Sequence, residues 1–243
     1  MTWIDRLSLF SPADALALVL LLLTWTIISF YIEQPPRGRP SVSVLMNDYR
    51  RDWMREMVTR QPRMFDSQVL GLMRQGTAFF ASASMIAIGG GLALIGNPKP
   101  LVDVAGDLSL INAPHVVWEI KLIVILLCLS HAFLKFVWAH RLFGYCAILM
   151  ASVPNKADDP IAYPRAAQAA EVSITAARAF NKAMRATYFS LASAAWLFGA
   201  VPLIIATVAT TAMLYRREFA SQSRDALMIA AHQDVTAAPA KTG

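Results

Sequence analysis

Four stretches of this chain are long and apolar enough to cross a lipid bilayer. They cover residues 13–32, 77–95, 116–139 and 188–215, and a transmembrane helix needs about 20 consecutive apolar residues. Backbone amides inside a bilayer must find partners within the chain, so each stretch predicts a helix. We therefore expect an all-α membrane protein of 243 residues, a single membrane domain with four transmembrane helices. Gly199 and Pro202 interrupt the fourth stretch, where we expect a kink.

Composition and charge support this class and predict an orientation. Hydrophobic residues make up 56% of the chain and charged residues 16%, and the net charge is +6. Basic residues concentrate in the first and third connections, so the positive-inside rule places both connections in the cytoplasm and both termini outside. We expect a location in the bacterial cytoplasmic (inner) membrane. The positive charge then faces anionic lipid headgroups, and the chain has no motif for nucleic-acid binding.

The two long connections have helical patterns of their own. Residues 43–75 place Met and aromatic side chains at helical spacing, with a break at Pro62, and residues 165–187 contain nine Ala without Gly or Pro. We expect amphipathic cytoplasmic helices at the membrane interface, with their apolar sides toward lipid. Residues 220–243 are expected to form a flexible tail. The predicted cytoplasmic basic surface consists of Arg50, Arg51, Arg55, Arg178, Lys182 and Arg185.

The third stretch carries polar side chains that are unusual within a membrane. At 100° per residue, Lys121, Cys128, His131 and Lys135 share one helix face about 80° wide. Charged groups facing lipid cost several kcal/mol, so this face predicts a protein-lined or water-lined interior. Two interpretations remain open. Lys121 and Lys135 either line an anion pathway with His131, or anchor the helix near the two interfaces while His131 bonds to a neighbouring helix.

The second stretch is rich in small residues, which predicts close helix packing. Its candidate packing residues are Ala83, Ala87, Gly89, Gly90 and Gly91. The three consecutive glycines lie in an apolar helix and lack the pattern of a phosphate-binding loop.

No motif of a known enzyme class occurs in the chain, so we expect neither catalysis nor a cofactor. Cys128 and Cys146 do not have the spacing of metal ligands, which predicts no metal site. Two function classes remain. The first is an accessory or structural subunit that forms homo-oligomers or docks to a membrane complex. The alternative is a homo-oligomeric channel or transporter whose basic intramembrane face favours anions.

Four blocks of sequence carry a resemblance to a known family. They read DYRRDWMREMVTRQPRMFDSQ from Asp48, FFASAS from Phe79, HAFLKFVWAHRLFGYCAILMASVP from His131 and FNKAMRATYFSLA from Phe180. Together they resemble a family of bacterial and plant four-span membrane proteins catalogued as a domain of unknown function. The resemblance extends from about Asp48 to Tyr215 and implies the four-span fold, without assigning a catalytic or binding residue.

Overall fold

The computed structural model describes residues 9–96 and 114–236, and this part of the chain folds into helices without strands. Residues 97–113 of the predicted connection between the second and third spans, and the last seven residues of the predicted tail, lie outside the described residues. The helices are α2 (Pro12–Glu33), α3 (Val42–Met57), α4 (Met64–Gly96), α6 (His115–Ala151), α7 (Ala162–Ala194), η1 (Ala195–Phe198), α8 (Ala200–Phe219) and α9 (Gln222–Thr236).

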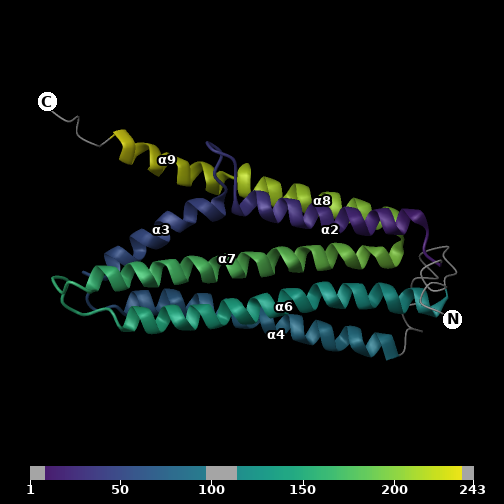
Figure 1. Cartoon of the computed structure of the whole chain (residues 1–243), viewed down its shortest axis with the longest axis horizontal. Coiled ribbons are helices and arrows are strands. Elements are labelled where there is room, and N and C mark those ends of the chain that lie inside the picture. The colour runs from purple at the N-terminus through teal and green to yellow at the C-terminus, as the bar shows by residue number, and fades with distance from the viewer. Residues whose placement is uncertain (1–8, 97–113, 237–243) are drawn as a thin grey trace.

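The helices form an elongated bundle with two halves. Helices α4, α6 and α7 run along most of its length, whereas α2 and α8 lie side by side along one half and α3 and α9 lie along the other (Figure 1). We call the half containing α2 and α8 the membrane half and the other the polar half. The 22 residues of α2 rise about 33 Å, close to the hydrocarbon thickness of a bilayer.

The surface of the membrane half is apolar. Helices α2, α4 and α6 are long and apolar enough to cross a membrane. Large hydrophobic side chains such as Phe30, Ile86 and Val201 are more than half exposed on these helices and on α8. Between Arg74 and the end of α4 the sequence has no charged residue. A lipid environment explains this exposure, since water would disfavour so large an apolar surface.

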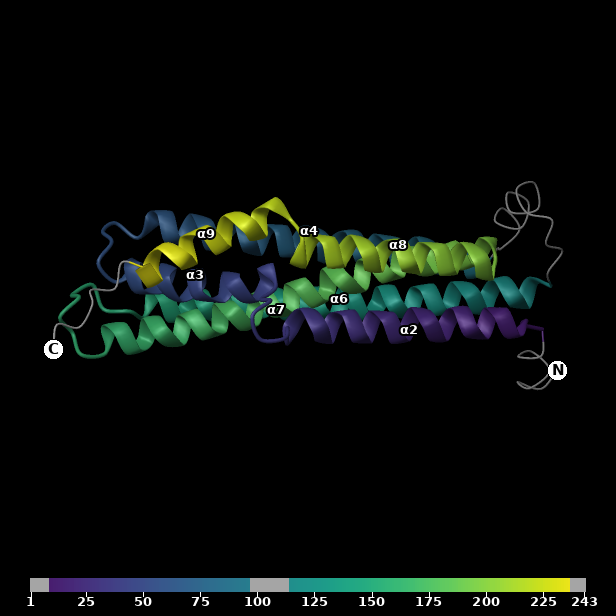
Figure 2. The same ribbon diagram turned by 90° about the horizontal axis from the view of Figure 1, so that it is seen from above.

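The chain reverses direction at Gly199, so the prediction of one helix over residues 188–215 is wrong. Gly199 has a φ of 114°, a conformation that costs little only without a Cβ atom. The short helix η1 ends there, and α8 returns antiparallel to α7 (Figures 1 and 2). Pro202 lies in the first turn of α8, where its missing N–H breaks no helical bond. The expected kink is therefore a hairpin turn.

This reversal also changes the expected position of the C-terminal segment. Helix α2 begins at one end of the bundle, and α8 ends near its middle, facing the polar half (Figure 1). The two ends of the described chain thus lie toward opposite ends of the bundle, whereas the sequence predicted both termini on the same side of a membrane. The expected flexible tail is also wrong for Gln222–Thr236, because these residues form α9. Arg224 Nε donates to the backbone oxygen of Pro40 at 3.0 Å.

The two segments predicted as cytoplasmic helices pack on one another. Helix α4 begins at Met64 and continues unbroken through the predicted second span, and α7 is likewise continuous from Ala162. Helix α3 packs along α7, and Met54 and Met57 are fully buried in a cluster with alanines of α7. Small alanine side chains permit this close approach, so protein covers α3 around these two methionines, whereas Met46 and Tyr49 stay exposed.

Gly91 packs tightly against α6, which gives a first testable consequence. A Cβ atom added to Gly91 would overlap the side chain of Leu126, whereas one added to Gly89 would meet open space. We expect Gly91→Leu to lower the free energy of unfolding in detergent by about 1–3 kcal/mol, the usual effect of overpacking. Gly89→Leu is the matched control and should change it far less. Equal losses in both variants would contradict this packing assignment.

Candidate functional site

Buried charge concentrates at the junction between the two halves. Glu33, the last residue of α2, accepts one hydrogen bond from Arg185 at 2.5 Å and forms an ion pair with Arg178 at 3.2 Å, both from α7. Arg185 is 3% exposed. A guanidinium so far from water requires a carboxylate partner, so Glu33 holds the end of α2 against α7.

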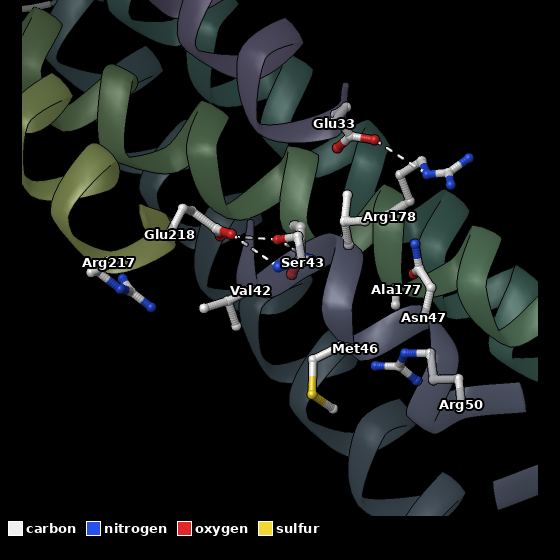
Figure 3. A pocket seen from close by; sticks show the side chains of 12 residues that line it. Glu33, Val42, Ser43, Met46, Asn47, Arg50, Ala177, Arg178, Arg217 and Glu218 are labelled. Atoms are coloured by element: carbon white, nitrogen blue, oxygen red, sulfur yellow. Dashed lines mark hydrogen bonds and ion pairs between the residues drawn. The ribbon is translucent and has the colours of Figure 1, made fainter. Parts of the chain in front are cut away.

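A polar cavity of about 250 Å³ adjoins this ion pair, where the ends of α2, α3 and α8 meet α7 (Figure 3). On one side, the backbone N–H and the hydroxyl of Ser43 donate to Glu218 at 3.0 and 2.9 Å. Asn181 Nδ2 donates to the hydroxyl of Ser43 at 3.3 Å. These bonds link the start of α3 to the end of α8 and to α7, so the cavity walls are held by long-range polar contacts.

Two arginines of α3 have contrasting environments. Arg50 lines the cavity and donates to the hydroxyl of Ser173 at 3.2 Å, and burial lowers the pKa of its guanidinium. Arg51 is more exposed and bonds to Glu171 at 2.8 Å and to Asp48 at 2.9 Å. These carboxylates raise the pKa of Arg51. Only Arg50 therefore combines partial burial with a position in the cavity wall.

The predicted basic surface is thus divided by the fold. Arg51 and Arg55 are exposed on α3, and Lys182 is exposed on α7. Arg178 is half exposed but paired with Glu33. Arg185 is buried, and its assignment to a surface is wrong because α2 covers it through Glu33.

Three of the four predicted intramembrane polar residues line one groove. Cys128, His131 and Lys135 face a groove of about 560 Å³ between α6 and α2, and Lys182 of α7 completes it. The ring of His131 packs edge-on against Trp25, with the ring centres 5.6 Å apart. The groove therefore places two lysines and a histidine beside an aromatic side chain.

Lys121 lies apart from this groove, near the far end of the membrane half. It is 5% exposed, and its ammonium donates to the backbone oxygen of Trp196 at 2.9 Å. The same ammonium lies 5.5 Å from the ring centre of Trp196, whose Nε1 donates to Asp14 at 2.7 Å. The same backbone oxygen of Trp196 also accepts from the N–H of Gly199 at 3.0 Å, and a cation is favourable at a helix C-terminus. Lys121 accordingly caps η1 just before the reversal at Gly199.

The predicted packing residues of α4 have two different environments: one residue contacts α6, and the others are exposed. Gly91 contacts Leu126 of α6, as described above. The other four, Ala83, Ala87, Gly89 and Gly90, are exposed on the single chain. Close packing at these four positions therefore requires a partner outside this chain.

The chemistry available at these sites is ionic. Within residues 9–96 and 114–236, no group of three or more His, Cys, Asp and Glu side chains is placed to hold a metal ion. Cys128 and Cys146 are buried thiols in α6. The groove combines cationic side chains with hydroxyl groups, which suits the binding of anions, whereas the junction cavity also contains the carboxylates Glu33 and Glu218.

Sequence reasoning missed the carboxylates that organise the junction. Glu33 ends an apolar run just before two prolines, and Glu218 directly follows two arginines. The available signal was an acidic residue close to the end of each of two apolar stretches. Their partners, however, lie 152 and 175 residues away in the sequence, respectively.

A comparison with protein families now identifies the group to which this chain belongs. Residues 16–223 match the model of a family described as "Protein of unknown function, DUF599". The chain belongs to the DUF599 family. This confirms the resemblance to a family without an assigned function that the four sequence blocks carry. No curated protein and no solved structure matches this DUF599 protein.

Proposed function

We propose that this DUF599 protein is a non-catalytic structural subunit of the bacterial cytoplasmic membrane that assembles with a second copy of itself through α4. The observation that carries this proposal is the exposed small-residue stripe of α4. From Ala78 to Ile95, Ser84 is the one buried side chain, and Ala83, Ala87 and Gly90 lie exposed along one side. Small residues at spacings of three and four let two membrane helices approach closely.

A second copy suits this stripe for two physical reasons. Lipid tails solvate apolar helices well, so helix association in a membrane depends on close packing, which small residues permit. The stripe also lies on a stretch without charged residues, so two copies meet there without repulsion. A two-fold axis would place the same stripe on both sides of the interface.

The proposed topology crosses the membrane five times. These are α2, the second half of α4, the first half of α6, the end of α7 with η1, and α8. The polar half contains the arginines of α3, and Arg216 and Arg217 end α8 on the same side. The positive-inside rule supports a cytoplasmic polar half, with the N-terminus outside and the C-terminus inside.

The environment of Lys121 favours this structural role over an anion pathway. In such a pathway Lys121 would form the outer part and Lys135 the inner part, about 21 Å apart along α6. Lys121 instead donates to the backbone of Trp196 and is buried. The groove around Lys135 opens at the flank of the bundle, where Leu127 is 65% exposed.

Mass measurement of the intact assembly tests the proposal. We expect a defined homo-oligomer in mild detergent and a shift to monomer in Ala87→Leu, because the added bulk separates the stripes. Ala93→Leu is the matched control, since Ala93 is also exposed but lies about a third of a turn from Ala87 around α4. A monomeric wild-type protein, or equal effects of the two substitutions, would contradict assembly through this stripe.

A further inference from the structure

The groove between α2 and α6 has an apolar end and a basic end. Leu22 and Trp25 of α2 and Leu127 of α6 form the apolar part. Lys135 of α6 and Lys182 of α7 form the basic part. Leu22 and Leu127 are more than half exposed, so the apolar part is open at the side of the bundle.

These two parts follow one another along the bundle axis. On α6, Leu127 precedes Lys135 by eight residues, or about 12 Å, and on α2, Leu22 precedes Ser29 by seven residues, or about 10 Å. Both helices run from the far end of the membrane half toward the junction (Figure 1). The apolar part therefore lies deeper in the membrane half, and the lysines lie beside the junction.

The charge of the basic end is not balanced by nearby carboxylates. The ion pairs formed within the described part of the chain include neither Lys135 nor Lys182. Glu33, at the end of the adjacent helix, is occupied by Arg178 and Arg185. Two ammonium groups facing one groove thus leave a site for a negatively charged group.

We propose that this groove binds one anionic phospholipid from the cytoplasmic leaflet. Its phosphate contacts Lys135 and Lys182, with the hydroxyl of Ser29 as a further donor, and one acyl chain lies against Leu22 and Leu127. The phosphate lies at headgroup depth because the lysines flank the junction. A lipid fits better than a free anion, because a free anion would leave the apolar wall unfilled. This binding site is separate from α4 and goes beyond the proposed assembly.

Trp25 supplies a direct readout, because it lines the apolar part of the groove. The protein is reconstituted in phosphatidylcholine vesicles that contain a minor fraction of a brominated lipid, because brominated acyl chains quench tryptophan fluorescence on contact. In one sample the brominated lipid is phosphatidylglycerol, and in the other it is phosphatidylcholine. The quenching of Trp25 is the difference between the fluorescence quenching of the wild-type protein and that of its Trp25→Phe variant. Two lysines at a membrane surface predict a preference for the anionic lipid of about 10- to 30-fold.

The variant Lys135→Gln/Lys182→Gln should abolish this preference and leave the melting temperature and oligomer mass unchanged. Arg74→Gln/Arg216→Gln is the matched control: it removes two exposed charges outside the groove and should keep the preference. Equal quenching by both lipids in the wild-type protein, or an equal loss of preference in both double variants, would overturn the proposal. Displacement of the anionic lipid by millimolar inorganic phosphate would instead identify a free-anion site and overturn the assignment to a lipid.

Discussion

Glu33→Gln is expected to lower the free energy of unfolding by about 3–5 kcal/mol, the usual cost of leaving a buried charge without its partner. Arg185 is 3% exposed and bonds to Glu33 at 2.5 Å, and Arg178 shares the same carboxylate. A neutral amide would leave the guanidinium of Arg185 uncompensated in a place that water does not reach. Denaturant titration of the purified protein in detergent measures the change.

The same substitution at an exposed ion pair is the matched control. Glu171 pairs with Arg51, and their side chains are 61% and 48% exposed. Solvent-exposed pairs contribute about 0–1 kcal/mol, so Glu171→Gln should have little effect. Similar losses for Glu33→Gln and Glu171→Gln would show that the junction pair is not effectively buried.

A double substitution separates the loss of an interaction from the burial of an unpaired charge. Replacing a buried ion pair with apolar side chains is often neutral or stabilising. We therefore expect Glu33→Met/Arg185→Met to recover most of the stability lost in Glu33→Gln. Arg178 retains access to solvent because it is half exposed. A double variant as unstable as Glu33→Gln would contradict this account of the junction.

The apolar periodicity of the sequence predicted individual helices better than their connections. The first three predicted spans lie within α2, α4 and α6, and the alanine-rich segment before the fourth lies in α7. These elements depend on local propensity and on hydrophobic length, which a sequence contains directly. The reversal at Gly199 depends on one positive φ angle within a long apolar run. The run itself has the same composition whether the helix continues or turns back.

The environments of charged residues were harder to predict because their partners are distant. Arg178, Lys182 and Arg185 have the spacing of a solvated stripe, yet Arg185 is buried by Glu33, which lies 152 residues earlier. Lys121 bonds to a backbone oxygen at the end of η1, and no side-chain pattern encodes that acceptor. Cys128, His131 and Lys135 share a face of α6 and line one groove, whereas Lys121, predicted on the same face, bonds elsewhere.

Labelling of single cysteines tests the five-pass arrangement most directly. In a chain with Cys128 and Cys146 replaced by Ala, a membrane-impermeant thiol reagent is added to intact cells that carry Leu9→Cys, Arg55→Cys or Ser223→Cys. All three positions are exposed in the structure, so each cysteine is available to a reagent on its own side of the membrane.

We expect labelling at position 9 from outside, and labelling at positions 55 and 223 only after the cells are permeabilised. This result follows from α8 turning back at Gly199 to end beside the polar half. Labelling of both positions 9 and 223 from outside, with position 55 protected, would restore the four-pass topology and contradict the account. Labelling at positions 55 and 223 alone would show that the orientation proposed here is inverted.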